Sequence, residues 1–383
     1  MSALERAHEL LATWKAELLR ELPADATIFD AHVHLGTDID GSTGRLDELL
    51  GIMAEYSIDR SFMFCLDEPD RHPGFRAPND RTLADAEQSG GRLIPFVRLD
   101  LKENPVDEAI RCLDAGARGI KLHPRAQKIS LEDERLPPIF ELAAERKVPI
   151  LIHGGRGLPP IAAHLHRLVE RCEGVQLIVA HAGIADMANL TARFAGMRGV
   201  FFDTSTWSAI DLLDFYRQMP PEQIVYASDY PYGRQPNSLL MALRTARLAG
   251  FDDEEVLNLL SRNAARIADG EAPLEPQRPK GGEELTQPTL LARIHQYLSM
   301  ATPLLWMRQP DTIGVLGLAL NTCDSPSNGF REQTEEIREL LLTAQVLWKA
   351  ALEEDEEAEQ IRSARFVSRL IHLADVLAVT AHA

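Results

Sequence analysis

Short apolar runs recur along the chain between residues 27 and 230, and a polar loop and a segment with helical periodicity follow most of them. Runs of this length that are rich in β-branched and aromatic residues predict buried strands. The eight runs are TIFDAHVH, RSFMFCLD, RLIPFVRLD, ARGIKLHP, VPILIHGG, VQLIVAHAG, GVFFDTST and QIVYASDYP. Segments such as PVDEAIRCLDAG and LPPIFELAAERK lie between them and predict amphipathic helices.

Strands that alternate with helices predict a sheet of parallel strands joined by right-handed crossovers. Eight such units in about 240 residues fit an α/β fold of the (β/α)8, or TIM barrel, type. A doubly wound open sheet is the alternative. Its dinucleotide-binding form would carry GxGxxG after the first strand, and the sequence has no such motif there. We therefore expect a TIM barrel over residues 27–270.

Helical patterns flank the expected barrel on both sides. Residues 1–26 alternate charges with leucines, without the apolar stretch of a signal peptide, and predict an N-terminal helix. Residues 271–288 are rich in Pro, Gly and charge and predict a linker. Residues 289–383 repeat apolar side chains at helical spacing and predict an all-helical C-terminal extension. Because its large apolar side chains must be buried, we expect a homodimer in which this extension takes part.

Composition narrows the classes of protein. The formal net charge of −18 disfavours binding to nucleic acid, whose phosphates are also negative. No run approaches the roughly 20 apolar residues of a membrane span. The four cysteines are scattered, without a CxxC pair, which is typical of reduced thiols in the cytoplasm and argues against a thiolate metal site. We expect a cytoplasmic protein whose partner is a small-molecule substrate.

Polar side chains gather where the expected strands end. They are His32, His34, Lys121, His123, His153, His181, Asp203 and Asp229. Functional groups of (β/α)8 barrels lie at the C-terminal ends of the strands. Side chains alternate along a strand, so His32 and His34 point the same way. Together with His153 and Asp229 they offer nitrogen and oxygen ligands that suit Zn²⁺ and also Mn²⁺, Fe²⁺ or Co²⁺.

Seven motifs resemble those of the amidohydrolase superfamily, and more narrowly the amidohydrolase-related branch that includes aminocarboxymuconate semialdehyde decarboxylase. They are DAHVHLG, GIKLHPRAQ, VPILIHGG, LIVAHAG, VFFDTST, YASDYPYG and VLNLLSRNAARIA. The resemblance covers residues 27–268 and implies a divalent metal ion, with Zn²⁺ as the first choice. It implies His32, His34, His153 and Asp229 as the ligands, and His181 as a base or weak ligand beside the metal-bound water.

The number of metal ions stays open at this point. In binuclear members of the superfamily a carboxylated lysine that ends strand four bridges two ions, and Lys121 occupies that place. The narrower branch is usually mononuclear, which favours one ion and leaves Lys121 and His123 for a second ion or for the substrate. Candidate substrate contacts in the loops are Arg125, Arg156, Arg234 and Trp207.

Three functions are compatible with these residues. The first is hydrolysis, in which a metal-bound water attacks a C–N or C–O bond of a small carbonyl substrate and His181 or Asp229 takes the proton. The second is non-oxidative decarboxylation of an aromatic or unsaturated acid at the same site. The third is a catalytically inactive barrel that serves as a binding or assembly module. A purely structural zinc needs no adjacent base, so His181 and Asp229 argue against the third.

Overall fold

The computed structural model describes residues 2–24, 26–281, 286–325, 329–354 and 356–381. The chain forms two compact units. The first comprises Pro23–Ser238 and Ala249–Gly281, and the second comprises Met1–Leu22, Leu239–Leu248 and Gly282–Ala383. Part of the predicted linker, residues 282–285, lies outside the described residues.

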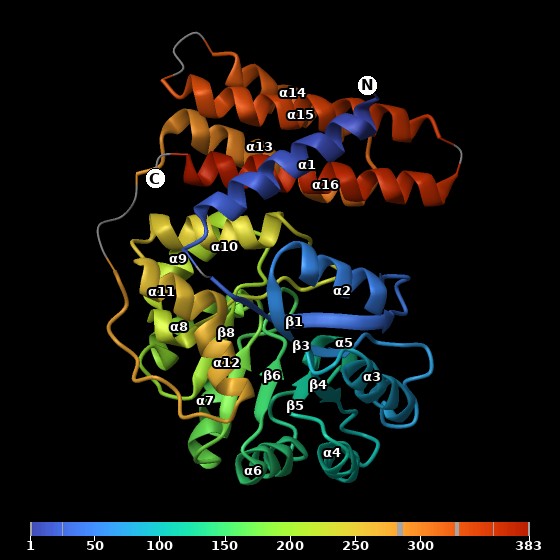
Figure 1. Cartoon of the computed structure of the whole chain (residues 1–383), viewed down its shortest axis with the longest axis vertical. Coiled ribbons are helices and arrows are strands. Elements are labelled where there is room, and N and C mark those ends of the chain that lie inside the picture. The colour runs from blue at the N-terminus through green and yellow to red at the C-terminus, as the bar shows by residue number, and fades with distance from the viewer. Residues whose placement is uncertain (1, 25, 282–285, 326–328, 355, 382–383) are drawn as a thin grey trace. The chain divides into compact units, whose positions relative to one another are not determined.

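Eight parallel strands follow one another in chain order through the first unit (Figure 1). They are β1 (Ile28–Thr37), β3 (Ile58–Cys65), β4 (Leu93–Arg98), β5 (Gly119–Leu122), β6 (Pro149–Ile152), β7 (Gln176–Val179), β8 (Val200–Asp203) and β9 (Ile224–Val225). A short strand that the apolar pattern did not predict, β2 (Thr43–Gly44), pairs antiparallel with the end of β1.

Backbone hydrogen bonds join β1 to the segment that directly follows β9. The Ala31 N–H donates to the Tyr226 carbonyl (2.8 Å), and the His34 N–H donates to the Tyr230 carbonyl (2.7 Å). A parallel bridge also pairs Val33 with Tyr230. These bonds close the sheet, so the predicted TIM barrel is confirmed, with a strand at each of the eight predicted runs.

Helices cover the outside of the strands, as the right-handed crossovers require (Figure 1). They are α2 (Leu46–Glu55), α3 (Arg76–Gln88), α4 (Pro105–Asp114), α6 (Leu136–Arg146), α7 (Ala162–Arg171), α8 (Met187–Phe194), α9 (Ala209–Gln218), α11 (Asp253–Leu257) and α12 (Asn263–Ala268). A π-helical turn, Asn258–Arg262, joins the last two, and the single turn α5 (Pro124–Gln127) follows β5.

The barrel interior is apolar up to the level of the site. Its buried cluster includes Phe64, Phe96, Leu151 and Phe201. Residues two positions further along a strand point the same way. His153 therefore follows Leu151 on the inward face, and Asp203 follows Phe201. The apolar interior thus ends directly beneath a ring of polar side chains at the C-terminal ends of the strands.

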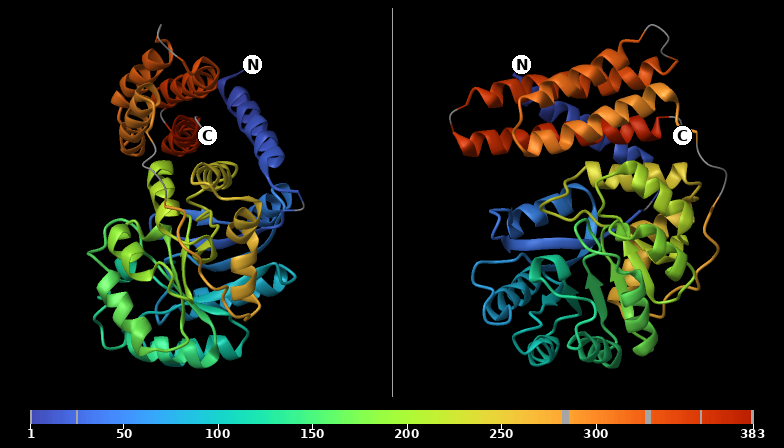
Figure 2. Two further views of the ribbon diagram at one scale, coloured as in Figure 1. Left: turned by 90° about the vertical axis from the view of Figure 1, so that its left-hand side faces the viewer. Right: turned by 180° about the vertical axis from the view of Figure 1, so that it is seen from behind.

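The second unit is helical. Its elements are α1 (Ala3–Glu21), most of α10 (Asn237–Leu248), α13 (Thr289–Trp306), α14 (Asp311–Cys323), α15 (Arg331–Leu352) and α16 (Glu357–Thr380). Helices α13 to α16 pack side by side, and α1 packs against α15 (Figure 2). Trp348 is fully buried among them, and His295 Nδ1 lies 2.6 Å from Asp375 Oδ1. The predicted helical extension is confirmed, and none of the described helices is both long and apolar enough to cross a membrane.

Candidate metal centre

Three ligand atoms lie close together at the C-terminal end of the barrel, two of them from β1 and one from the turn that follows β9. His32 Nε2 is 3.1 Å from His34 Nε2, and each of these nitrogens is 3.3 Å from Asp229 Oδ1. All three residues are buried. They form a His–His–Asp group whose ligand atoms could reach one ion.

The spacing of these atoms fits a divalent metal ion. Tetrahedral bonds of about 2.0–2.1 Å place ligand atoms about 3.3–3.4 Å apart, close to the distances observed. Burial lowers the pKa of His32 and of His34 well below the usual value, which keeps both rings neutral and their lone pairs available. Burial also raises the pKa of Asp229 well above its usual value, and a nearby cation would favour its charged form.

The backbone around Asp229 is held in an uncommon conformation. Asp229 has φ of +61°, in the left-handed region that Asp and Asn tolerate better than most residues. Its N–H donates to the His32 carbonyl (3.0 Å), and its own carbonyl accepts from the Tyr232 and Gly233 N–H groups at 2.8 and 2.9 Å. This turn directs the carboxylate back toward β1. His181, at the end of β7, also has φ of +61°, which is typical of backbone strain at a functional site.

A second group of histidines comes from the loops after β5, β6 and β7. His181 Nε2 lies 3.0 Å from His153 Nδ1, and the His123 ring stacks on the His153 ring with centroids 4.0 Å apart. Burial lowers the pKa of all three side chains. The buried His153 Nε2 has no hydrogen-bond partner in the described structure, as a metal-ligand nitrogen would before the ion binds. His153 is not in the close group of three ligand atoms, so its role as fourth ligand stays a prediction.

Lys121 lies next to the three ligand atoms and not at the surface. Its Nζ is 3.2 Å from His32 Nε2 and 4.4 Å from the centre of the Phe64 ring. Burial lowers its pKa to about 7, against the opposing effect of Asp203 and Asp229. Lys121 is therefore placed where it could contact a substrate or a second ion beside His32.

Two buried carboxylates in the site were not assigned a role from the sequence. Asp203 Oδ2 lies 2.7 Å from His32 Nδ1, and its Oδ1 accepts from Ser205 and from the His181 N–H. Asp30 Oδ1 accepts from the N–H groups of His32 and Ser228, and burial raises its pKa to about 7. The sequence carries a signal for both residues. Asp203 ends an expected strand, and Asp30 lies two positions before His32, on the same side of the strand.

The predicted substrate contacts lie in the loops around the site. The Arg125 guanidinium donates to the Arg156 carbonyl (3.4 Å), and its charge contributes to lowering the pKa of His153. The Arg156 side chain is 78% exposed and lies 3.7 Å from Asp211. Arg234 pairs with Glu48, and Trp207 is 47% exposed. Their contacts with a substrate stay predictions.

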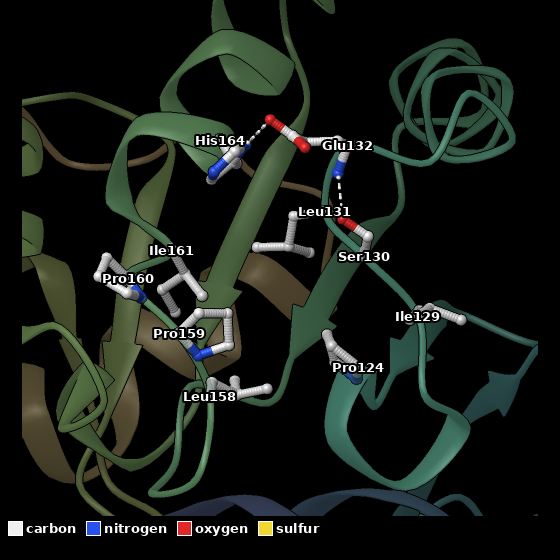
Figure 3. A pocket seen from close by; sticks show the side chains of 10 residues that line it. All are labelled: Pro124, Ile129, Ser130, Leu131, Glu132, Leu158, Pro159, Pro160, Ile161 and His164. Carbon is white, nitrogen blue, oxygen red and sulfur yellow. Dashed lines mark hydrogen bonds and ion pairs between the residues drawn. The ribbon is translucent and has the colours of Figure 1, made fainter.

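A pocket of about 400 Å³ lies between the loops that begin after His123 and His153 (Figure 3). Its wall is largely apolar and consists of Pro124, Ile129, Ser130, Leu131, Glu132, Leu158, Pro159, Pro160, Ile161 and His164. His164 Nδ1 lies 3.5 Å from Glu132 Oε1 at one side of this wall. The residues of this pocket are separated along the chain and form no motif, so the sequence gives no signal for it.

One protein family matches the sequence of this chain. The family model described as amidohydrolase matches residues 29–267, more than half of the chain. No curated protein matches the chain.

Several solved structures are similar to this chain. IDCase of Metarhizium anisopliae in apo form has a TM-score of 0.50 and 15% identity, over 64% of this chain and 98% of that chain. A probable 2-pyrone-4,6-dicarboxylic acid hydrolase of Acinetobacter baumannii with citric acid bound has a TM-score of 0.48 and 13% identity, over 63% and 99%. The 4-oxalomesaconate hydratase LigJ of Rhodopseudomonas palustris has a TM-score of 0.47 and 18% identity, over 64% and 96%. At 15% identity, the similarity to IDCase supports the fold of this chain and nothing about its reaction.

Proposed function

This chain is a member of the amidohydrolase family, and we propose that it is a metal-dependent hydrolase that cleaves a C–N or C–O bond of a small carbonyl compound. The membership confirms the resemblance that the motifs indicated. The observation that carries the proposal is the close group of His32 Nε2, His34 Nε2 and Asp229 Oδ1, at distances that suit one ion.

The metal ion would be held by His32, His34 and Asp229, with the unpartnered Nε2 of His153 as the fourth ligand. A bound divalent ion, with Zn²⁺ as the first choice, supplies Lewis acidity for the substrate carbonyl and for the attacking water. The donor set contains no thiolate, so Mn²⁺, Fe²⁺ and Co²⁺ suit it as well.

Protons would be moved by the chain's own buried groups. The Asp229 carboxylate, whose Oδ1 lies 3.3 Å from both His32 Nε2 and His34 Nε2, would take the proton from the attacking water. Burial lowers the pKa of His181, and its Nε2 lies 3.0 Å from His153 Nδ1, so His181 would orient His153 beside the attacking water. Lys121, in its charged form, would stabilise the negative oxygen that develops on the carbonyl carbon.

Removing the metal is the experiment that tests this function. Purified protein would be assayed against a panel of lactones and esters, with acid release followed at constant pH, and against a panel of amides, with release of the amine measured. CO₂ would be measured in parallel for a matched panel of aromatic and unsaturated acids. We expect hydrolysis to fall to background after chelation and to return on addition of about one equivalent of Zn²⁺ or Mn²⁺ per chain.

Other results would contradict the proposal in distinct ways. Hydrolysis that persists after chelation would exclude a metal-dependent mechanism. Metal-dependent CO₂ release without hydrolysis would identify a decarboxylase that uses the same residues. A protein that neither binds metal nor turns over any compound would be the inactive binding module.

A further inference from the structure

The two oxygens of the Asp203 carboxylate, at the end of β8, have different partners. Oδ2 lies 2.7 Å from His32 Nδ1. Oδ1 accepts from the N–H groups of His181 (2.8 Å) and Ser205 (3.0 Å), and from the Ser205 hydroxyl (2.5 Å). The side chain is fully buried. Since an ionised carboxylate only accepts hydrogen bonds, His32 must carry its ring proton on Nδ1.

This proton position leaves a lone pair on His32 Nε2. That nitrogen faces His34 Nε2, Asp229 Oδ1 and Lys121 Nζ at 3.1 to 3.3 Å. We propose that Asp203 is a positioning residue that fixes the Nδ1–H tautomer of His32, so that Nε2 is free to bind the metal ion. The inference rests on the proposed function for the ion, whereas the tautomer itself is a property of the metal-free protein.

The same carboxylate orders the neighbouring rings. The Ser205 hydroxyl donates to Asp203, so its oxygen accepts the Nδ1–H of His181 at 2.8 Å. His181 Nε2 is then the acceptor for His153 Nδ1 at 3.0 Å, which leaves His153 Nε2 without a proton. The Ser205 carbonyl, 3.0 Å from His181 Nδ1, independently fixes the same tautomer of His181. The tautomer of His32 therefore tests the positioning role of Asp203 most directly.

An Asp203→Asn variant should reverse the His32 tautomer. The two backbone N–H groups at Oδ1 cannot turn into acceptors, so the amide oxygen must occupy that place. The amide NH₂ then faces His32 Nδ1 and can only donate to it. His32 must move its proton to Nε2, where it blocks the metal. Asp203→Ala removes the acceptor but imposes no tautomer.

The experiment measures zinc affinity and histidine tautomers together. Zinc affinity is measured by competition with a chromogenic chelator. Tautomers are read from ¹⁵N NMR of histidine-labelled, metal-free protein, with the His32 signals assigned by their absence in His32→Ala. We expect Nδ1–H in the wild type and Nε2–H in Asp203→Asn, with a 10- to 100-fold loss of zinc affinity, about the range for partners of ligand histidines. The loss in Asp203→Ala should be smaller.

A merely structural role for Asp203 predicts the opposite order, because Asn preserves the shape of Asp and Ala leaves a cavity. The matched control is Asp186→Asn, since Asp186 Oδ2 also accepts two backbone N–H groups, those of Ile161 and Ala162, at 2.8 and 2.9 Å. Its zinc affinity should equal that of the wild type.

Two results would overturn the inference. One is Nε2–H at His32 in the wild type, which needs no variant to fold. The other is a zinc affinity in Asp203→Asn that equals the wild type or exceeds that of Asp203→Ala. A wild type that carries Nδ1–H at His32 but binds no zinc, manganese, iron or cobalt would instead contradict the proposed function and leave the tautomer assignment in place.

Discussion

Asp229→Asn is expected to lower turnover by roughly 10³-fold or more, within the range observed for loss of a general base, and metal affinity should fall as well. The amide keeps the shape of the side chain but has no negative charge for the ion and no basicity for the proton. Turnover would be measured at saturating metal, with the melting temperature recorded in parallel.

The fold should survive this substitution. Asn accepts the left-handed backbone at φ of +61° as readily as Asp does, and the substitution leaves the backbone hydrogen bonds of residue 229 unchanged. We expect the melting temperature of the metal-free variant to lie within a few degrees of the wild-type value, a small shift of the size typical of isosteric changes. Near wild-type turnover at saturating metal would show that Asp229 is neither a ligand nor the base.

Among the substitutions considered, Phe64→Ala should lower the free energy of unfolding the most. Phe64 is fully buried in the barrel interior, and its ring contacts those of His32 and His34, with centroids 4.9 and 4.5 Å apart. Lys121 Nζ lies over its face. Removal leaves a cavity beneath the candidate metal centre and should lower the free energy of unfolding of the barrel by about 3–5 kcal/mol. Urea denaturation followed by far-UV circular dichroism measures this loss.

Two further variants serve as controls for the stability loss of Phe64→Ala. Phe64→Leu keeps most of the volume and should cost less than about 1.5 kcal/mol. Trp207→Ala removes a larger ring that is about half exposed, and should change the free energy of unfolding much less than Phe64→Ala. A Phe64→Ala loss of no more than that of Phe64→Leu would show that this ring does not support the site.

The strands and most of the ligands could be predicted because their signals are local. Period-two alternation places His32 and His34 on one side of β1, and six of the eight expected strands end in the polar residues named above. The role of Asp203 could not be predicted in this way. Its contact with His32 joins residues 171 positions apart and exists only once the barrel closes.

Side-chain orientation set the other limit of prediction. His153 was expected among the ligands, but whether its Nδ1 or its Nε2 faces the ion depends on His181 and therefore on Ser205. The antiparallel strand β2 could not be predicted, because a strand of two residues is too short to show an alternation of apolar and polar side chains. The homodimer, the cytoplasmic location and the boundaries of the linker stay predictions.

Metal content is the most direct measurement of the central claim. Elemental analysis of purified protein would be made on the wild type, His32→Ala and Lys121→Ala. We expect about one ion per chain in the wild type, loss of that ion in His32→Ala and its retention in Lys121→Ala, as a mononuclear site requires. Two ions, one of them lost with Lys121, would indicate a carboxylated lysine bridge. No bound ion, even after reconstitution with zinc or manganese, would contradict the metal centre.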